Sequence, residues 1–501
     1  MGEGTSTNNR QNQLTVECMK GRPKTDEYFK RLHGMVETLR SEIAGGTYAA
    51  GETLPSEKRL AARFGLGNNS VRKGLSMLVE EGLIEKIPRV GNRVITGSGR
   101  KRVKLSLVCK SVSMINLDLA GLLAQFQQKY PWIHVDVNVT SYLPDADEHG
   151  APFDVMLLDQ LHFDWLAEKG ACGQLAPLPE RNEFYPMLNR LFMQSGILRA
   201  QPVIFSPVVL CYNKDHFRES GLPEPDGSWT WHDLLRAAEK LSNGKGRYGF
   251  GFPVPHINRW PIFLLQSGER FEWENGKLKD IRGTKLLNSI EMCKQIAHNR
   301  KAFPLYFSDS NNDYLRMFEE GKLSMVINSY MGLNLWKDKP LNYDISPIPF
   351  MDEPRTLVLC LGAAVHARSL HRQESKLLID FLASPAAQRH IMKRTLSIPA
   401  SAIVTVPARA SESDCRRPGR YALFREIMSS YRTYRDLNIP VSSYPALFDQ
   451  LRTYWADMMS EDELCTRIKY VLEAGGNPEM TETAKRNKDL EQYQIWSVKV
   501  Q

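Results

Sequence analysis

The sequence contains no run of apolar residues that is long enough to cross a membrane. Its first residues, Met1 to Asn12, are polar, and no apolar run follows a basic segment as it does in a secretory signal. None of the eight cysteines forms a Cys-x-x-Cys pair or stands at zinc-ligand spacing from a histidine. These absences predict a cytoplasmic protein with reduced thiols, no metal site and no membrane partner.

Sequence motifs that accompany catalysis are also missing. The chain has no Gly-x-Ser-x-Gly, no phosphate-loop pattern and no His-Glu-x-x-His. The acidic pair Glu319-Glu320 falls on the surface of a predicted helix, where solvation is its simplest explanation. We therefore expect no catalytic residues and no cofactor, and a binding protein rather than an enzyme.

The length of 501 residues is too great for one ordinary domain, and 42% hydrophobic with 24% charged residues is typical of a globular protein. The formal net charge is +8, and residues 24–102 hold about 15 Lys and Arg against about 9 Asp and Glu. This basic segment suits an anionic partner. We expect a disordered leader over 1–24, a first domain over 25–98, a basic linker over 99–102 and a second domain over 103–501.

The first domain has the pattern of two short helices joined by a tight turn, followed by a hairpin. Apolar residues recur at the helical period before Gly45-Gly46, and Ser56 is a plausible N-cap of the next helix. A Gly-containing turn between two helices is typical of the helix-turn-helix. In order, we expect a helix over 28–44, a second helix from its cap Ser56 to the turn at 65–67, and a third helix from Asn68 or Asn69 to Gly82. Strands over 83–87 and 92–95 and a wing tip over 88–91 follow.

Four motifs of this segment are those of one family: Leu54-Pro55-Ser56-Glu57, Ser70-Val71-Arg72, Glu81-Gly82-Leu83-Ile84-Glu85 and the Gly91…Val94 wing. On these residues the segment closely resembles the winged helix-turn-helix (α+β) DNA-binding domain of the GntR family. The resemblance implies a double-stranded DNA operator as partner. It also implies a homodimer, because a two-fold operator needs two heads at a fixed spacing.

The resemblance, together with the way a recognition helix enters the major groove, places the DNA-contacting side chains. Its N-terminal residues face base edges, where Asn pairs with adenine and Arg with guanine, while other basic residues meet phosphates. The expected DNA-binding residues are Lys58, Arg59, Asn68, Asn69, Ser70, Arg72, Lys73, Arg89 and Arg93. Family members commonly carry an Arg-x-Thr pattern where this chain has Asn68-Asn69-Ser70, and Gln-Gly in place of Pro88-Arg89. The family's operator sequence therefore does not carry over.

Strand and helix patterns alternate from residue 103 onward, which predicts a parallel α/β sheet. Several blocks then follow in a fixed order: Tyr212-Asn213-Lys214-Asp215, Trp229-Thr230-Trp231, Gly321-Lys322-Leu323 and Ser384-Pro385-Ala386-Ala387. These blocks resemble the family-1 extracellular solute-binding proteins of the maltose-binding type. The resemblance implies a two-lobed α/β fold of the periplasmic-binding-protein type 2, whose lobes close on a ligand.

Ligands of such sheets lie beyond the carboxyl ends of the strands. Aromatic faces stack on sugar rings, and carboxylates accept hydrogen bonds from hydroxyls. The expected ligand-binding residues are Ser111, Ser113, Asp159, Phe205, Trp260, Tyr330 and Gly362. Each has a structural alternative: Trp260 and Tyr330 suit the core equally well, and Asp159 can cap the helix that follows it.

Taken together, the two resemblances predict a transcription regulator whose second domain senses a small polar solute. A sugar or oligosaccharide is the leading class. Two alternatives stay open: a solute receptor of an ABC importer, and a DNA-binding protein whose second domain only dimerises.

Overall fold

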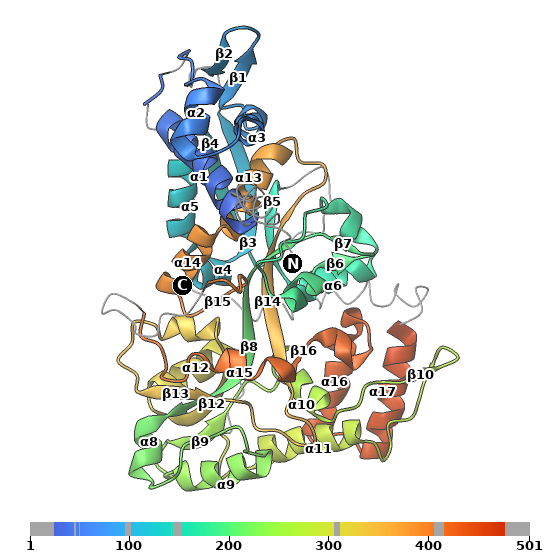
Figure 1. Ribbon diagram of the computed structural model, residues 1–501. Coiled ribbons are helices and arrows are strands. Elements are labelled where there is room, and N and C mark those ends of the chain that lie inside the picture. The colour runs from blue at the N-terminus through green and yellow to red at the C-terminus, as the bar shows by residue number, and fades with distance from the viewer. Residues whose placement is uncertain are drawn as a thin grey trace, which may run out of the picture. The chain divides into compact units, whose positions relative to one another are not determined.

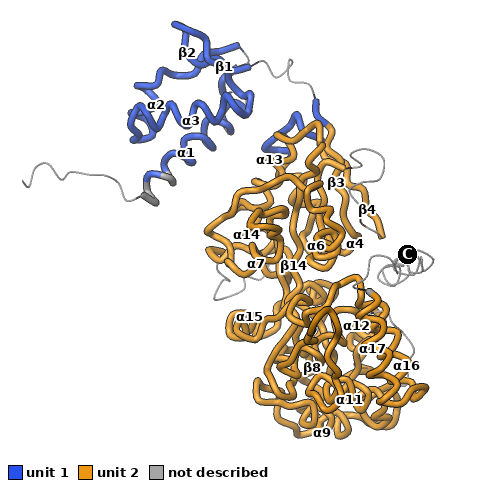
Figure 2. The backbone as a smooth tube through the Cα atoms, turned by 90° about the vertical axis from the view of Figure 1, so that its right-hand side faces the viewer, with its two compact units in different colours: residues 1–103, 127–134 blue, residues 104–126, 135–501 orange. Residues whose placement is uncertain are grey.

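The computed structural model describes residues 25–44, 47–49, 51–95, 102–141, 143, 153–304, 311–404 and 415–475. The chain forms two compact units, shown in Figure 2: unit 1 is Met1–Val103 with Gln127–His134, and unit 2 is Lys104–Phe126 with Val135–Gln501. The expected leader and nearly all of the expected basic linker lie outside the described residues. Among the described helices, none combines the length and apolarity that crossing a membrane requires.

Unit 1 contains the expected helix-turn-helix and wing. Ser56 caps the second helix, since its Oγ accepts a hydrogen bond from the Arg59 N–H at 3.4 Å, and Gly65 ends that helix at a left-handed φ of 63°. Its elements are α1 (Thr25–Ala44), α2 (Glu57–Phe64), α3 (Asn68–Glu80), β1 (Ile84–Ile87) and β2 (Gly91–Val94) (Figure 1).

One small apolar core holds these helices together. Leu32, Met35 and Val36 of α1 meet Val71 and Leu75 of α3, and all five are buried. Gly74 lets the two helices approach, because a Cβ there would lie 2.2 Å from the terminal methyl of Met35. The wing strands pair antiparallel from Ile84↔Val94 to Ile87↔Gly91.

Unit 2 is built on one ten-stranded sheet that is mixed rather than parallel. The order is β4 (Ile133–Thr140), β3 (Val103–Lys110), β5 (Val155–Asp159), β14 (Thr356–Val365), β8 (Gln201–Asn213), β12 (Leu323–Ser329) and β9 (Tyr248–Gly251). β3 and β5 are parallel, as are β12 and β9, but β14 and β8 run antiparallel to their neighbours. The expectation of a parallel sheet was therefore wrong for its centre. Three further strands join off this path: β13 (Tyr343–Ser346), β15 (Ile398–Pro399) and β16 (Tyr431–Arg432).

The long strands β8 and β14 pass from one lobe of unit 2 to the other (Figures 1 and 2). All thirteen residues of β8 are buried. The first lobe carries α4 (Ser111–Leu117), α5 (Leu119–Lys129), α6 (Gln160–Glu168), α7 (Pro186–Leu191), α13 (Arg372–Ala383) and α14 (Pro385–Arg394). The second carries α8 (Lys214–Glu219), α9 (Trp231–Leu241), α10 (Pro261–Gln266), α11 (Lys285–His298), α12 (Asn311–Glu319), α16 (Tyr444–Trp455) and α17 (Glu461–Gly475).

Two segments with helical periodicity, residues 116–130 and 421–437, are not single helices. Residues 116–130 span the end of α4 and all of α5, because Asp118 adopts a left-handed φ of 50° between the two helices. The segment 421–437 is a series of short turns: α15 (Leu423–Glu426), η3 (Met428–Ser430), β16 and η4 (Tyr434–Leu437). Helical periodicity in the sequence does not distinguish one long helix from consecutive turns that bury the same side.

Candidate DNA-binding surface and interlobe site

The first turn of α3 presents the side chains expected to read DNA. α3 begins at Asn68, and Gly67 at its N-cap provides no side-chain cap. Asn68, Asn69 and, one turn later, Arg72 are exposed. Of the nine residues expected to contact DNA, all are exposed except the half-buried Ser70. Their accessibility is compatible with contact, and their roles stay predictions.

Two of the exposed arginines are held by carboxylates of unit 1. The Arg72 Nε donates to Glu57 Oε2 at 2.7 Å, which joins α3 to the first residue of α2. On the wing, Arg93 donates from Nε and Nη2 to Glu85 Oε1, at 3.0 and 2.7 Å. Arg89 at the wing tip has a left-handed φ of 66°. Glu57 and Glu85 were not among the residues expected to contact DNA, although both stand in the motifs that identified the segment.

In unit 2, a lysine and an aspartate lie at the carboxyl ends of the neighbouring strands β3 and β5. Lys110 Nζ donates to Asp159 Oδ2 at 2.8 Å, and Asp159 Oδ1 accepts from the His162 N–H at 2.9 Å. Burial alone would raise the pKa of Asp159, but the Lys110 ammonium and the His162 N–H outweigh it, so this pKa is lowered. Asp159 therefore caps α6, which was the structural alternative. Lys110 was missed, and its signal was a charged residue ending an apolar strand.

The three aromatic ligand candidates lie in the apolar cores of unit 2. Phe205 and Tyr330 are fully buried, and Trp260 is 1% exposed. The Tyr330 hydroxyl donates to the Tyr421 carbonyl at 2.9 Å and accepts from the Phe424 N–H at 3.1 Å. Trp260 packs against Tyr444 and Phe448, and Phe205 against Tyr185, Phe424 and Tyr431. In this arrangement the protein's own side chains cover the rings.

The remaining ligand candidates do not lie on open loops. Ser111 is the first residue of α4, and Ser113 is buried within that helix. Gly362 was expected after a strand, but it lies inside β14, where an added Cβ would come within 3.0 Å of the Phe192 ring. Its expected position was wrong because the apolar strand continues to Val365.

One face of α6 meets the second lobe through four side chains. Leu161 and Trp165 pack against the apolar core of that lobe. Asp164 accepts from the Arg435 Nε at 2.8 Å, and the Glu168 carboxylate accepts from the backbone N–H groups of Val441 and Ser442 at 2.5 and 3.0 Å. The spacing i, i+3, i+4, i+7 places all four on one helix face. We call these residues the interlobe contact.

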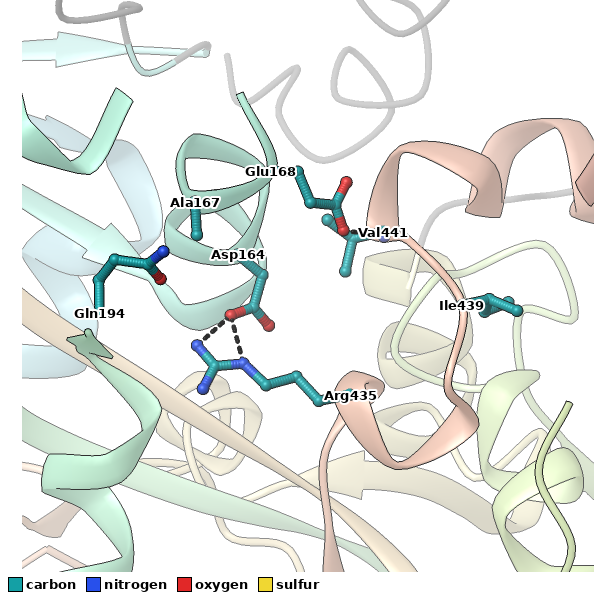
Figure 3. Close-up of a pocket in the computed structure, with 7 residues that line it drawn as sticks. All are labelled: Asp164, Ala167, Glu168, Gln194, Arg435, Ile439 and Val441. Carbon is teal, nitrogen blue, oxygen red and sulfur yellow. Dashed lines mark hydrogen bonds and ion pairs between the residues drawn. The ribbon is translucent and has the colours of Figure 1, made fainter. Parts of the chain in front are cut away.

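A pocket of about 400 Å³ lies beside this contact (Figure 3). Its volume falls within the range of about 300–1,000 Å³ that small-molecule sites occupy. Charged, amide and aliphatic groups line it: Asp164, Ala167, Glu168, Gln194, Arg435, Ile439 and Val441. The sequence offered only a weak signal, two acids four residues apart on an expected helix.

Asp164 is the most buried charged group of this pocket. Its side chain is 5% exposed, whereas that of Arg435 is 41% exposed. Burial raises the pKa of Asp164 to about 6, although the Arg435 guanidinium opposes the rise. We therefore expect the carboxyl group of Asp164 to change charge in mildly acidic solution.

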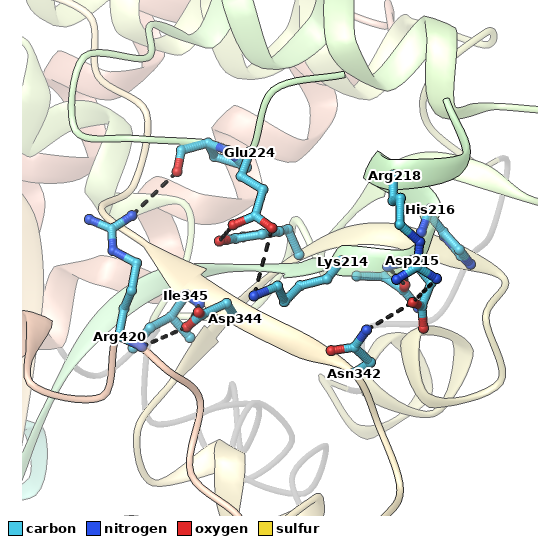
Figure 4. A network of polar contacts seen from close by, with 12 residues as sticks. Lys214, Asp215, His216, Arg218, Glu224, Asn342, Asp344, Ile345 and Arg420 are labelled. Carbon is cyan, nitrogen blue, oxygen red and sulfur yellow. Dashed lines mark hydrogen bonds and ion pairs between the residues drawn. The ribbon is translucent and has the colours of Figure 1, made fainter. Parts of the chain in front are cut away.

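The block Tyr212–Asp215 has a structural role at the outer end of β8 (Figure 4). The Asn213 side-chain oxygen accepts from the Asp215 and His216 N–H groups and so caps α8. The Tyr212 hydroxyl donates to Glu224 at 2.7 Å, and Lys214 pairs with the same carboxylate at 3.7 Å. Polar residues of this block thus hold helix and strand together.

Across the part of the chain that the structure describes, no three His, Cys, Asp or Glu side chains form a group that could hold a metal ion.

Two families match the chain. Residues 118–389 match the family described as "Bacterial extracellular solute-binding protein", and residues 34–94 match "Bacterial regulatory proteins, gntR family". The first match spans more than half of the chain.

Curated relatives and solved structures also resemble the chain. The sn-glycerol-3-phosphate-binding periplasmic protein UgpB of Escherichia coli (strain K12) is 25% identical over 227 residues, which are 42% of this chain and 52% of that protein. The chain thus spans about half the length of this relative. An ABC substrate-binding protein of Listeria monocytogenes in complex with cycloalternan superposes with a TM-score of 0.63 at 18% identity, covering 77% of this chain and 99% of that one. Maltose-bound MalE3 of T. maritima gives 0.63 at 17%, covering 74% and 99%. At these identities the two structures show a shared fold.

Proposed function

Because the chain belongs to the bacterial extracellular solute-binding protein family and carries a gntR-family regulatory domain, we propose that it is a solute-sensing transcription regulator. In this proposal, unit 1 binds an operator and unit 2 closes on a small polar solute. The observation that carries it is the combination of an exposed, basic recognition helix with two lobes that meet beside a pocket of about 400 Å³.

The surface of unit 1 supports DNA binding. Exposed amide and guanidinium groups at the start of α3 are the groups that read base edges in the major groove. Exposed Lys58, Arg59 and Lys73 are suited to phosphates. A two-fold operator needs two recognition helices, so the active form is proposed to be a homodimer in the cytoplasm.

The pocket chemistry supports a polyhydroxylated solute. Carboxylates and the Gln194 amide accept or donate hydrogen bonds to hydroxyls, while Ile439 and Val441 offer apolar contact to a sugar ring. Of the similar proteins, UgpB is an sn-glycerol-3-phosphate-binding protein, and the two solved structures hold cycloalternan and maltose. A sugar or oligosaccharide is therefore the leading class, and a phosphorylated polyol is the second. The proposed role is binding without catalysis.

Coupling between the two activities must be reciprocal. If the solute changes operator affinity by some factor, the operator changes solute affinity by the same factor. We propose that the solute stabilises the closed state in which the interlobe contact is formed, and that this state changes the affinity of the homodimer for its operator.

The test has two steps on the full-length chain. A thermal-shift panel of maltooligosaccharides, monosaccharides and sn-glycerol 3-phosphate finds the solute, which at 100 times its Kd should add about 2.7 kcal/mol to the stability of the folded state. An operator, selected from random duplexes, is then titrated with and without that solute. Different affinities support the proposal, and identical affinities overturn the sensor.

Other outcomes identify the competing functions. If no solute of any class stabilises unit 2 while the chain still dimerises on DNA, the second unit serves dimerisation. If cell fractionation places the chain in the periplasm or at the membrane, an importer receptor replaces the regulator.

A further inference from the structure

We propose that Glu57 is a positioning residue that sets how Arg72 reads DNA, an inference that rests on the proposed DNA-binding function. The two side chains come from different helices, α2 and α3, and meet at Nε of the arginine. The ligand class is a guanine edge in the major groove.

The point of attachment decides which edge of the guanidinium stays available. Arginine has five N–H donors in a rigid plane. Glu57 Oε2 accepts the Nε–H at 2.7 Å, and the described residues offer no acceptor to either terminal nitrogen of Arg72. Nη1 and Nη2 therefore form an end-on fork. Such a fork matches the O6 and N7 acceptors of guanine, which is the commonest specific contact in the major groove.

The placement of the pair favours recognition over stability. The Arg72 side chain is 62% exposed and that of Glu57 is 28% exposed. Ion pairs this exposed add little to folding stability. A carboxylate near DNA also repels phosphates, so Glu57 lowers affinity for any duplex. Its benefit is to fix one orientation of a long, flexible side chain before DNA arrives, which reduces the entropy lost on binding.

The wing provides a matched pair with a different geometry. Glu85 Oε1 accepts from both Nε and Nη2 of Arg93, at 3.0 and 2.7 Å. This occupies the side edge of the guanidinium and leaves Nη1 as the donor without a described acceptor. One remaining donor suits a phosphate oxygen, which carries no base identity. We therefore expect that removing the Glu57 carboxylate changes the base preference of the protein and that removing the Glu85 carboxylate does not.

The experiment measures base preference on the full-length chain. Duplexes are selected from a random pool with the wild type, and each position of the selected duplex is then replaced in turn. Because a glutamine oxygen could still accept the Nε–H, the variant is Glu57→Met, for which we expect discrimination at one G·C pair to fall about tenfold, with affinity for unrelated DNA equal to or above that of the wild type. For the matched variant Glu85→Met we expect the base preferences to stay as in the wild type.

Two further variants separate positioning from charge and from folding. Arg72→Lys keeps the charge without the fork, so it should lose the same G·C preference, and Glu57→Met should add nothing to it. Melting temperatures of all variants should match the wild type. A Glu57→Met variant that melts with the wild type and reads every position as the wild type does overturns the positioning role. If the wild type selects no duplex at all, the proposed DNA-binding function fails, and this inference fails with it.

Discussion

Two arginine–carboxylate pairs of this protein show how the same chemistry serves different purposes in different surroundings. Arg72 and Glu57 lie on the surface of unit 1, while Arg435 and the buried Asp164 lie between the lobes of unit 2. Water screens the Arg72–Glu57 pair, so the pair adds little to the free energy of folding. Its contribution is the orientation that it gives to the Arg72 side chain. The second pair excludes water from its carboxylate, so its charge state affects whether the lobes stay together.

The largest difference between the two pairs is expected in how the stability of the protein depends on pH. The pKa of Asp164 is about 6 in the folded protein and about 3.9 in an unfolded chain, a difference of up to about 3 kcal/mol. Because the folded-state pKa is the higher one, this contribution is fully present below pH 4 and is lost as the pH rises through 6. We expect the wild type to lose up to about 3 kcal/mol of stability relative to Asp164→Asn between pH 4 and pH 7.5.

The two proteins differ only at residue 164, so comparing their melting curves at each pH cancels the contributions of the other titrating groups to stability. Glu57→Gln serves as the matched control, since its pair is exposed and should leave the difference flat. Parallel curves for the wild type and Asp164→Asn would show that Asp164 is not buried in solution.

Removing Arg435, the cation that pairs with the buried Asp164, should have the second-largest effect on stability. In Arg435→Met, Asp164 takes up a proton instead of remaining a buried, unpaired charge, which limits the loss to about 1–2 kcal/mol at pH 7.5. Urea unfolding measures it. The exposed pair Arg452–Asp449 on α16 provides the control, and Arg452→Met should change stability by less than about 0.5 kcal/mol. Equal losses in both variants would mean that burial makes no difference.

For the exposed Arg72–Glu57 pair, we expect the opposite result: a loss of DNA binding without a loss of stability. Arg72→Ala should leave the melting temperature unchanged, because the exposed pair with Glu57 adds little to folding, but it should weaken operator binding about tenfold, because the fork that contacts DNA is lost. Electrophoretic mobility shift or fluorescence anisotropy measures the affinity. Unchanged affinity for the selected operator would remove Arg72 from the recognition surface.

A smaller effect is expected at the other end of the interlobe contact. Glu168 is exposed, yet its carboxylate accepts two backbone N–H groups of the second lobe. Glu168→Gln should keep only one of these acceptors and weaken binding of the stabilising solute about threefold, or about 0.7 kcal/mol. Calorimetric titration measures this loss, and a variant that binds the solute as tightly as the wild type would separate Glu168 from closure.

The two units also differ in how much of their structure could be predicted from the sequence. Unit 1 is held by contacts that short patterns record: the Ser56 cap, the left-handed Gly65 and apolar residues at helical spacing in α1 and α3. Its elements accordingly lie close to the expected ranges. The Glu57–Arg72 contact was not foreseen, because two charges on separate helices leave no periodic signal.

In unit 2 the blocks that identified the fold are structural, such as the Asn213 cap of α8. The interlobe contact escaped notice because Asp164 and Arg435 are 271 residues apart. The aromatic candidates were chosen for chemistry that suits a sugar and a core equally, and the structure covers Tyr330 and Trp260 with other rings.

Local pattern thus specified the helices, turn and wing of unit 1, because caps, turns and periodic burial act within a few residues, whereas the two lobes of unit 2 were expected only from the resemblance to a known family. Only the folded chain placed the carboxylate of Asp164 beside the guanidinium of Arg435 and removed it from water. Burial and charge pairing depend on which distant segments meet across the sheet, and that meeting decided where unit 2 has a pocket and which of its acids can change charge.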